Sequence, residues 1–268
     1  MEILLNEKPV SFREGETLFG LRDRIKPGAD ILILNGFPVQ QDQALGNGDR
    51  VSLIRRGEQP SRQELEALMA ARHTPGVHEK VRGACVGIAG VGGLGSAVAV
   101  ALARIGVGHL ILADFDLVEP SNLNRQQYFV DQIGLPKVEA LRENLARINP
   151  YVKISVHNLR LTPENIPSLF GEVDVMVEAF DSADQKAMLT ECFLTRVKTV
   201  PLVAGSGLAG FAPSNSVLTR KAGRRLILVG DGETAARPGE GLMAPRVGIA
   251  AHHQANAVLR LLLGEEAG

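Results

Sequence analysis

Short apolar runs separated by polar, glycine-containing turns fill the first 57 residues of the chain. The runs at 3–5, 10–12, 31–34 and 51–54 have the length and composition of strands. Residues 16–25 carry apolar side chains at helical spacing, at Leu18, Leu21 and Ile25, before Pro27 and Gly28 stop the pattern. The pattern therefore predicts a small domain at 1–57, with the order strand, strand, helix, strand, strand.

From residue 84 onward, strand-length apolar runs alternate with longer segments of helical periodicity. Strands are predicted near 85–89, 109–114, 152–157, 173–179 and 199–204, with helices between them. The stretch 205–224 predicts extra antiparallel strands, 230–245 a loop and 246–263 a last helix. This alternation is typical of βαβ units, so the fold class is α/β, with a Rossmann-like, mainly parallel sheet covered by helices on both faces. A linker helix region at 58–83 connects 1–57 to this domain at 84–268, and a capping box at Ser61 and Glu64 opens its predicted helix.

The composition and charge of the chain argue against several classes of function. The 268 residues carry a net charge of −1 and only 4% aromatic residues, which argues against binding to nucleic acid or to a charged membrane surface. The apolar stretches are too short to span a bilayer, and the polar residues from Asn6 onward exclude a signal peptide. The two cysteines, Cys85 and Cys192, form no CxxC pair, so we expect no zinc site and a cytoplasmic location.

The most informative motif is a glycine-rich turn after the strand at 85–89. Its members are Gly90, Gly92, Gly93 and Gly95. Glycines at the start of a helix let backbone N–H groups approach a phosphate, which the helix dipole also favours. Asp114 ends the next strand, where an acidic side chain commonly holds ribose hydroxyls, and Asp116 follows it. These residues alone also fit an NAD-dependent oxidoreductase.

Charged residues further along the chain favour a nucleoside triphosphate over a dinucleotide. Lys137 opens a helix after Pro136, where the dipole disfavours a cation unless an anion lies alongside. Arg125 lies in a loop at the same edge of the sheet, and its planar guanidinium suits phosphoryl oxygens. Asp181 follows an apolar strand and could bind Mg²⁺, although a helix N-cap is an equally good explanation for this residue taken singly.

Residues 1–57 resemble the ThiS-like sulfur carriers, which are small ubiquitin-like proteins of the β-grasp fold. The resemblance rests on the turn at Asn6 and on three motifs, at 14–18, 35–39 and 48–51. A working carrier of that family ends in Gly-Gly with a free carboxylate. In this chain Gly57 is a single glycine that continues into Glu58, so the segment cannot be adenylylated unless the chain is cut. We expect a former carrier that docks or regulates.

The glycine turn, the Asn-x-x-Arg at Asn122 and Arg125, and the late Asp181 together resemble the ThiF/MoeB/HesA adenylyltransferases, which are related to ubiquitin-activating enzymes. The resemblance covers residues 84–263. It implies ATP, Mg²⁺ and a ThiS-like carrier as substrates and partners, a homodimer, and adenylylation of the carrier's C-terminal glycine. The fused domain at 1–57 favours thiamine (thiazole) biosynthesis or a related sulfur transfer by association only, and a molybdopterin or cysteine-biosynthesis carrier stays open. It further implies that Asn122, Arg125 and Lys137 contact phosphates, that Asp114 holds the ribose and that Asp181 binds Mg²⁺.

The chain departs from that family in three respects. It lacks the paired CxxC motifs of a structural zinc, and residues 230–245 contain no cysteine for a covalent intermediate. The motif of the arginine that a partner subunit usually supplies is not clear in this chain; Arg72 is the nearest candidate, and a plain surface arginine is the simpler interpretation. Two alternatives stay open: the NAD-dependent oxidoreductase, and a non-catalytic ATP-binding module occupied by its own carrier-like domain.

Overall fold

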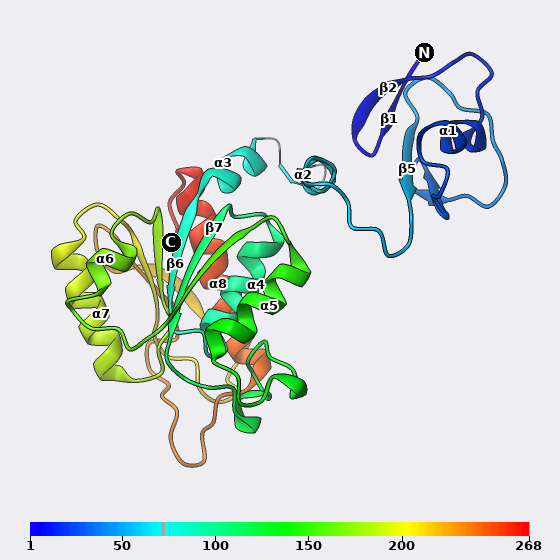
Figure 1. Cartoon of the computed structure of the whole chain (residues 1–268). Helices are drawn as coiled ribbons and strands as arrows, with labels where there is room; N and C mark the ends of the chain where they lie inside the picture. Colours follow the sequence, from blue (N-terminus) through cyan, green and yellow to red (C-terminus); the bar gives the residue numbers. More distant parts are fainter. Residues whose placement is uncertain (71–72, 75, 268) are drawn as a thin grey trace. The chain divides into compact units, whose positions relative to one another are not determined.

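The computed structural model describes residues 1–70, 73–74 and 76–267, which form two compact units, Met1–His78 and Glu79–Gly268. Each unit has its own sheet (Figure 1). Each also has its own hydrophobic core. Among the described residues, no helix combines the length and the apolar character that a bilayer crossing requires.

The first unit contains a five-stranded sheet in the order β2-β1-β5-β3-β4 with one helix packed on it. The strands are β1 (Glu2–Leu5), β2 (Lys8–Ser11), β3 (Ile31–Leu34), β4 (Phe37–Pro38) and β5 (Arg50–Ile54). The helix α1 (Leu18–Ile25) begins at Thr17, whose hydroxyl accepts a hydrogen bond from the N–H of Gly20. Leu18 and Leu21 are fully buried against the sheet. The predicted strands and helix are confirmed, and β4, with two residues, is too short for the pattern to reveal.

The chain turns sharply where β5 ends. The N–H of Glu58 donates to the carbonyl of Arg55, and Gly57 has a φ of +78°, in the left-handed region that glycine adopts readily. The helix α2 (Arg62–Ala70) follows, and the hydroxyl of Ser61 caps it by accepting from the N–H of Glu64. The next helix, α3 (Val77–Gly83), is a second helix in the linker helix region 58–83, where only the helix that the capping box opens was predicted.

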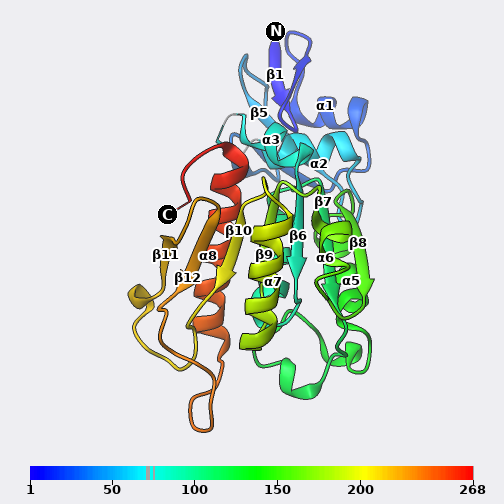
Figure 2. The same ribbon diagram turned by 90° about the vertical axis from the view of Figure 1, so that its left-hand side faces the viewer.

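The second unit is built on a seven-stranded sheet in the order β11-β12-β10-β9-β6-β7-β8 (Figure 2). Every neighbouring pair is parallel except β11 and β12. The strands are β6 (Cys85–Ala89), β7 (His109–Asp114), β8 (Lys153–Asn158), β9 (Val175–Glu178), β10 (Leu202–Gly205), β11 (Leu218–Lys221) and β12 (Leu226–Gly230). The predicted α/β class with a mainly parallel sheet is confirmed.

Helices cover both faces of this sheet (Figures 1 and 2). One face carries α4 (Gly93–Arg104), α5 (Lys137–Ile148) and α8 (Ala244–Leu263). Of these, α4 contacts both α5 and α8. The other carries α6 (Ile166–Phe170) and α7 (Ala183–Arg196). Short 3₁₀ turns lie at Pro120–Asn122, Val130–Gln132 and Ser214–Ser216. Phe170 and Phe193 are fully buried in the core beneath α6 and α7.

The end of the sheet differs in detail from the expectation. Antiparallel strands are predicted within 205–224, and β11 is one of them, but its partner β12 lies beyond this stretch and is parallel to β10. The side chains explain the arrangement. The Leu-Ile-Leu-Val run of β12 takes the inner position, whereas β11, with Thr219, Arg220 and Lys221, takes the edge, where polar and charged residues are tolerated.

Candidate functional site

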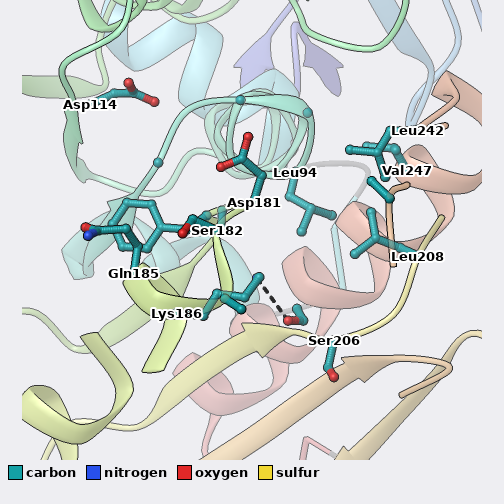
Figure 3. A pocket seen from close by; sticks show the side chains of 18 of the residues that line it. Leu94, Asp114, Asp181, Ser182, Gln185, Lys186, Ser206, Leu208, Leu242 and Val247 are labelled. Atoms are coloured by element: carbon teal, nitrogen blue, oxygen red, sulfur yellow. Dashed lines mark hydrogen bonds between the residues drawn. The ribbon is translucent and has the colours of Figure 1, made fainter. Parts of the chain in front are cut away.

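A pocket lies at the carboxyl ends of the parallel strands. The strands β6, β7 and β8 extend the sheet in one direction, and β9, β10 and β12 extend it in the other, so the strand order reverses between β6 and β9. Open α/β sheets bind ligands outside the strand ends at such a reversal. A pocket of about 790 Å³ opens there, lined by segments that follow β6, β7, β9 and β10 (Figure 3).

Most of the predicted site residues line this pocket. They are Gly90, Gly92, Gly93, Asp114, Asp116, Arg125, Lys137 and Asp181. Two predicted residues, Gly95 and Asn122, are not among its lining residues. The side chain of Asn122 is buried and caps the 3₁₀ turn that it ends, since its Oδ1 accepts from the N–H of Glu119 at 3.0 Å.

The glycine turn brings bare backbone to the pocket. Gly90 has a φ of +83°, and a Cβ atom at this position would lie 2.9 Å from the carbonyl oxygen of Ala179. Gly92 is the N-cap of α4 and has no side chain to satisfy the first N–H groups of the helix. The start of α4 can therefore donate these hydrogen bonds to an anion. Gly95 has a packing role, because a Cβ atom there would overlap the carbonyl oxygen of Gly90.

Asp114 is tied to the glycine turn. One carboxylate oxygen accepts from the N–H of Val91 at 2.7 Å, and the other accepts from the N–H of Asp116 at 2.9 Å. The buried hydroxyl of Tyr128 donates to the carbonyl of Val91 at 2.7 Å, and burial raises the pKa of Tyr128, which keeps it a donor. This role of Tyr128 could not be predicted from the sequence, because no local pattern links the residue to a turn 37 residues away.

Lys137 is almost fully buried at the first position of α5. Its Nζ lies 2.8 Å from Oδ2 of Asp116, and its N–H donates to the carbonyl of Asp116. The predicted conflict between this cation and the helix dipole is thus offset by Asp116 before any ligand binds. Asp116 is itself half exposed and lines the pocket, so the ion pair presents a charged edge to the cavity.

Arg125 and Gln126 lie beside the glycine turn. The guanidinium of Arg125 donates to the carbonyl of Ser121 and to Oδ1 of Asn124, while its buried Nε has no hydrogen-bond partner. The amide oxygen of Gln126 is also buried without a partner, although its side chain lines the pocket. Buried polar atoms are rarely left unsatisfied, so both point to a ligand with polar groups. Gln126 was not among the predicted site residues.

Asp181 follows β9 and is exposed in the pocket. Within the described chain its carboxylate forms no hydrogen bond or ion pair, and Asp184 lies in the first turn of α7, where it complements the helix dipole. No group of three or more histidine, cysteine or acidic side chains in the described residues could hold a metal by itself. A free carboxylate fits Mg²⁺ of the kind that takes its other ligands from water and phosphate oxygens.

A buried ion pair supports the floor of the pocket. Both carboxylate oxygens of Glu178 lie 3.0 Å from Nζ of Lys186, which also donates to the carbonyl of Gly205 at 3.0 Å. The same carboxylate accepts from the N–H of Phe180 at 2.7 Å. Burial raises the pKa of Glu178, and Lys186 opposes that shift. The sequence offered one signal, an acidic residue ending an apolar strand, which requires a partner if it is buried.

A second buried ion pair supports the opposite wall. Nη2 of Arg246 lies 2.5 Å from Oδ2 of Asp231, and both side chains are at least nine-tenths buried. Burial by itself would raise the pKa of Asp231, but hydrogen bonds from the N–H groups of Thr234 and Glu233 and from Arg246 lower it to about 2. The carboxylate is therefore ionised at neutral pH.

The candidate partner arginine, Arg72, lies outside the described residues. Both cysteines are free, and burial raises the pKa of each thiol, so neither has the character of an activated nucleophile. Cys192 is a buried residue of α7, while Cys85 is half-buried, with its Sγ 3.4 Å from Nδ1 of His109.

The chain matches two protein families. A ThiF family model matches residues 65–268, and a ThiS-like ubiquitin model matches residues 1–57. Molybdopterin-synthase adenylyltransferase of Escherichia coli (strain K12) is 36% identical over 192 residues, which are 69% of this chain and 76% of that protein. Ubiquitin-like modifier-activating enzyme 5 of Caenorhabditis elegans is 51% identical over 120 residues, which are 41% of this chain and 29% of that longer protein.

Solved structures show the same fold. E. coli tRNA N6-threonylcarbamoyladenosine dehydratase, TcdA, solved in complex with ATP, aligns with a TM-score of 0.62 at 24% identity, over 73% of this chain and 92% of its own. E. coli MccB with ATP aligns with a TM-score of 0.55 at 24% identity, over 69% of this chain and 57% of its own. At this identity the likeness concerns the fold alone. The family match over most of the chain is decisive: this protein belongs to the ThiF family and carries a ThiS-like ubiquitin domain at its N-terminus.

Proposed function

We propose that the protein uses ATP to adenylylate the C-terminal glycine of a separate ThiS-like sulfur carrier protein. The observation that carries this proposal is the content of one pocket, which gathers the glycine turn, Asp114, Arg125, the Lys137–Asp116 pair and the unpaired Asp181. Relatives named adenylyltransferases support the same reaction class. An NAD-dependent oxidoreductase would give no role to Arg125, Lys137 or Asp181.

Each subsite of the pocket suits one part of ATP. The N-terminus of α4 and the cations of Arg125 and Lys137 suit the phosphates, and Asp114 at the end of β7 suits the ribose hydroxyls. The guanidinium of Arg160 lies 5.7 Å from the centre of the Phe115 ring, and both side chains line the pocket. This pair offers a flat surface on which the adenine can stack.

The proposed reaction needs no nucleophile from the protein. A carboxylate oxygen of the carrier attacks the α-phosphorus, the bond from that phosphorus to the bridging oxygen breaks, and pyrophosphate leaves with its electron pair. The protein's part is to align the two substrates and to neutralise charge on the phosphoryl oxygens with Arg125, Lys137 and the N–H groups of α4. Mg²⁺ held by Asp181 would add positive charge next to the same oxygens.

By association, the domain at 1–57 favours a carrier of the thiamine (thiazole) type, so we propose that the enzyme acts in thiamine biosynthesis. We also propose that it is a homodimer. Its own tail is a poor substrate, since Gly57 is in peptide linkage to Glu58 and lies in a tight turn. We therefore expect the substrate to be a second, free carrier that ends in Gly-Gly.

The direct test is ATP–pyrophosphate exchange with Mg²⁺, with and without a ThiS-like carrier ending in Gly-Gly. Exchange that depends on the carrier is the expected result. ATP binding without exchange would instead indicate a regulatory or occluded protein, and a lack of ATP binding would revive the dinucleotide alternative.

Asp181 provides a test at the residue level. We expect Asp181→Ala to lower the exchange rate by roughly 100-fold or more, in the range for loss of a group that stabilises transition-state charge. Asp131→Ala is the matched control, because Asp131 is an exposed aspartate that does not line the pocket. Normal exchange by the Asp181 variant, measured at saturating Mg²⁺, would remove this residue from the proposed site.

A further inference from the structure

The pocket has a second side that suits a ligand other than a nucleotide. Its lining residues from 206–209 and 232–242 are mostly small or apolar, and Glu233 is the only charged one among them. In the view of Figure 3, the side chains of Leu208, Leu242 and Val247 lie on the far side of Asp181 from Asp114. These lining residues include no cation that could bind phosphate, and their small side chains leave room for a glycine-rich peptide segment. This side therefore suits the polypeptide substrate of the proposed reaction.

The two segments that form this side share one anchor. The Asp231 carboxylate accepts from the N–H of Glu233 at 2.8 Å, the N–H of Thr234 at 2.9 Å and the hydroxyl of Thr234 at 2.8 Å. The hydroxyl of Thr234 accepts in turn from the N–H of Ala209 at 3.0 Å. Gly207 packs so closely on Asp231 that a Cβ atom at Gly207 would overlap the carboxylate. Segments 206–209 and 231–234 are therefore fixed around one buried carboxylate.

Arg246, which lies in α8, donates a hydrogen bond to the same carboxylate. One of its terminal nitrogens donates to the carbonyls of Ala212 and Pro213, and the other donates to the hydroxyl of Ser216 and to Asp231. Neither Arg246 nor Asp231 lines the pocket. The pair can act on a ligand only through the wall segments that it holds, which distinguishes it from the residues on the nucleotide side.

We infer that Asp231 and Arg246 are positioning residues for the second substrate, the C-terminal segment of the carrier. The inference rests on the proposed function and assigns the two substrates to different parts of the site. The Asp231–Arg246 pair sets the wall that the carrier contacts, while the segments after β6 and β7 bind ATP independently of this pair.

The test compares Asp231→Asn and Arg246→Lys with the wild type by ATP–pyrophosphate exchange and by direct ATP binding. We expect the KM for the carrier to rise by about 10-fold or more, since small misplacements of substrate-binding groups have effects of this order. The ATP dissociation constant should stay within about 2-fold of the wild-type value, which also shows that the variant is folded. Ser216→Ala removes one hydrogen bond to Arg246 and should shift the carrier KM in the same direction by a smaller factor.

Arg237→Lys is the matched control, because Arg237 pairs with Glu240 on the same loop but is exposed and does not line the pocket. It should leave both constants unchanged. Equal losses for ATP and carrier, or an unchanged carrier KM in all three anchor variants, would overturn the inference while leaving the proposed function intact. Wild-type protein without carrier-dependent exchange would overturn the proposed function and this role with it.

Discussion

At the scale of single residues, Gly95 is constrained by packing rather than by a ligand. A Cβ atom at this position in α4 would overlap the carbonyl oxygen of Gly90, which is part of the rigid turn beneath the pocket. We expect Gly95→Ala to destabilise the second unit by about 1–3 kcal/mol, the usual cost of overpacking, and to weaken ATP binding because the turn must move. Thermal unfolding and ATP titration of the purified variant measure both effects.

The same substitution in α8 provides the control. Gly248 lies inside that helix with open space around the position of a Cβ atom, so Gly248→Ala should be neutral or stabilising by up to about 1 kcal/mol. If Gly95→Ala unfolds at the wild-type temperature and binds ATP normally, the close approach of α4 to the glycine turn does not constrain the protein in solution.

At the scale of elements, the Glu178–Lys186 pair joins the ends of β9 and β10 to α7. Lys186→Met would leave the carboxylate of Glu178, which is 1% exposed, without its cation. Removing one partner of a buried ion pair typically costs about 3–5 kcal/mol. Glu178→Gln/Lys186→Met together should recover much of that loss, because no unpaired charge then remains. Chemical denaturation of the two single variants and the double variant gives the coupling energy.

The destabilisation should depend on pH in a defined direction. Burial already raises the pKa of Glu178 above its ordinary value of 4.5, and loss of Lys186 should raise it further. The folded variant then binds a proton that the unfolded chain releases, so its free energy of unfolding falls as pH rises above 4.5. We expect Lys186→Met to be closer to wild type at pH 5 than at pH 8, and the double variant to lack this trend.

Elements with a clear apolar period could be predicted from the sequence, and those set by long-range contacts could not. The strands at 85–89 and 109–114 carry continuous apolar runs, which identify buried parallel strands. The position of β12 between β10 and β11 follows from packing across the sheet, which no local period encodes. In the same way, Asp114 and Arg125 were recognisable from local motifs. Glu178 and Arg246 were not, because each is explained only by a partner 8 or 15 residues away.

At the scale of the whole molecule, the chain combines a ThiF domain with a domain that resembles that family's substrate. The resemblance extends from the sequence motifs to the fold. The five-stranded sheet and α1 enclose a complete core, which includes the buried Leu18 and Leu21. What a substrate requires and this domain lacks is a free end. Directly after β5 the backbone turns at Gly57 and continues into α2. The domain thus has the shape of a carrier without its reactive carboxylate.

The intact chain should therefore not adenylylate itself. With ATP and Mg²⁺ but no added carrier, we expect neither pyrophosphate exchange above background nor a gain of one adenylyl group by mass spectrometry. Arg56→Gly creates a Gly-Gly pair at 56–57 and should remain equally inert, because the carbonyl of Gly57 is still an amide and a poor nucleophile towards phosphorus. An adenylyl group on the intact chain of either protein would contradict this prediction. If a fragment ending at Gly57 accumulated first, proteolysis would instead be the step that converts the domain into a carrier.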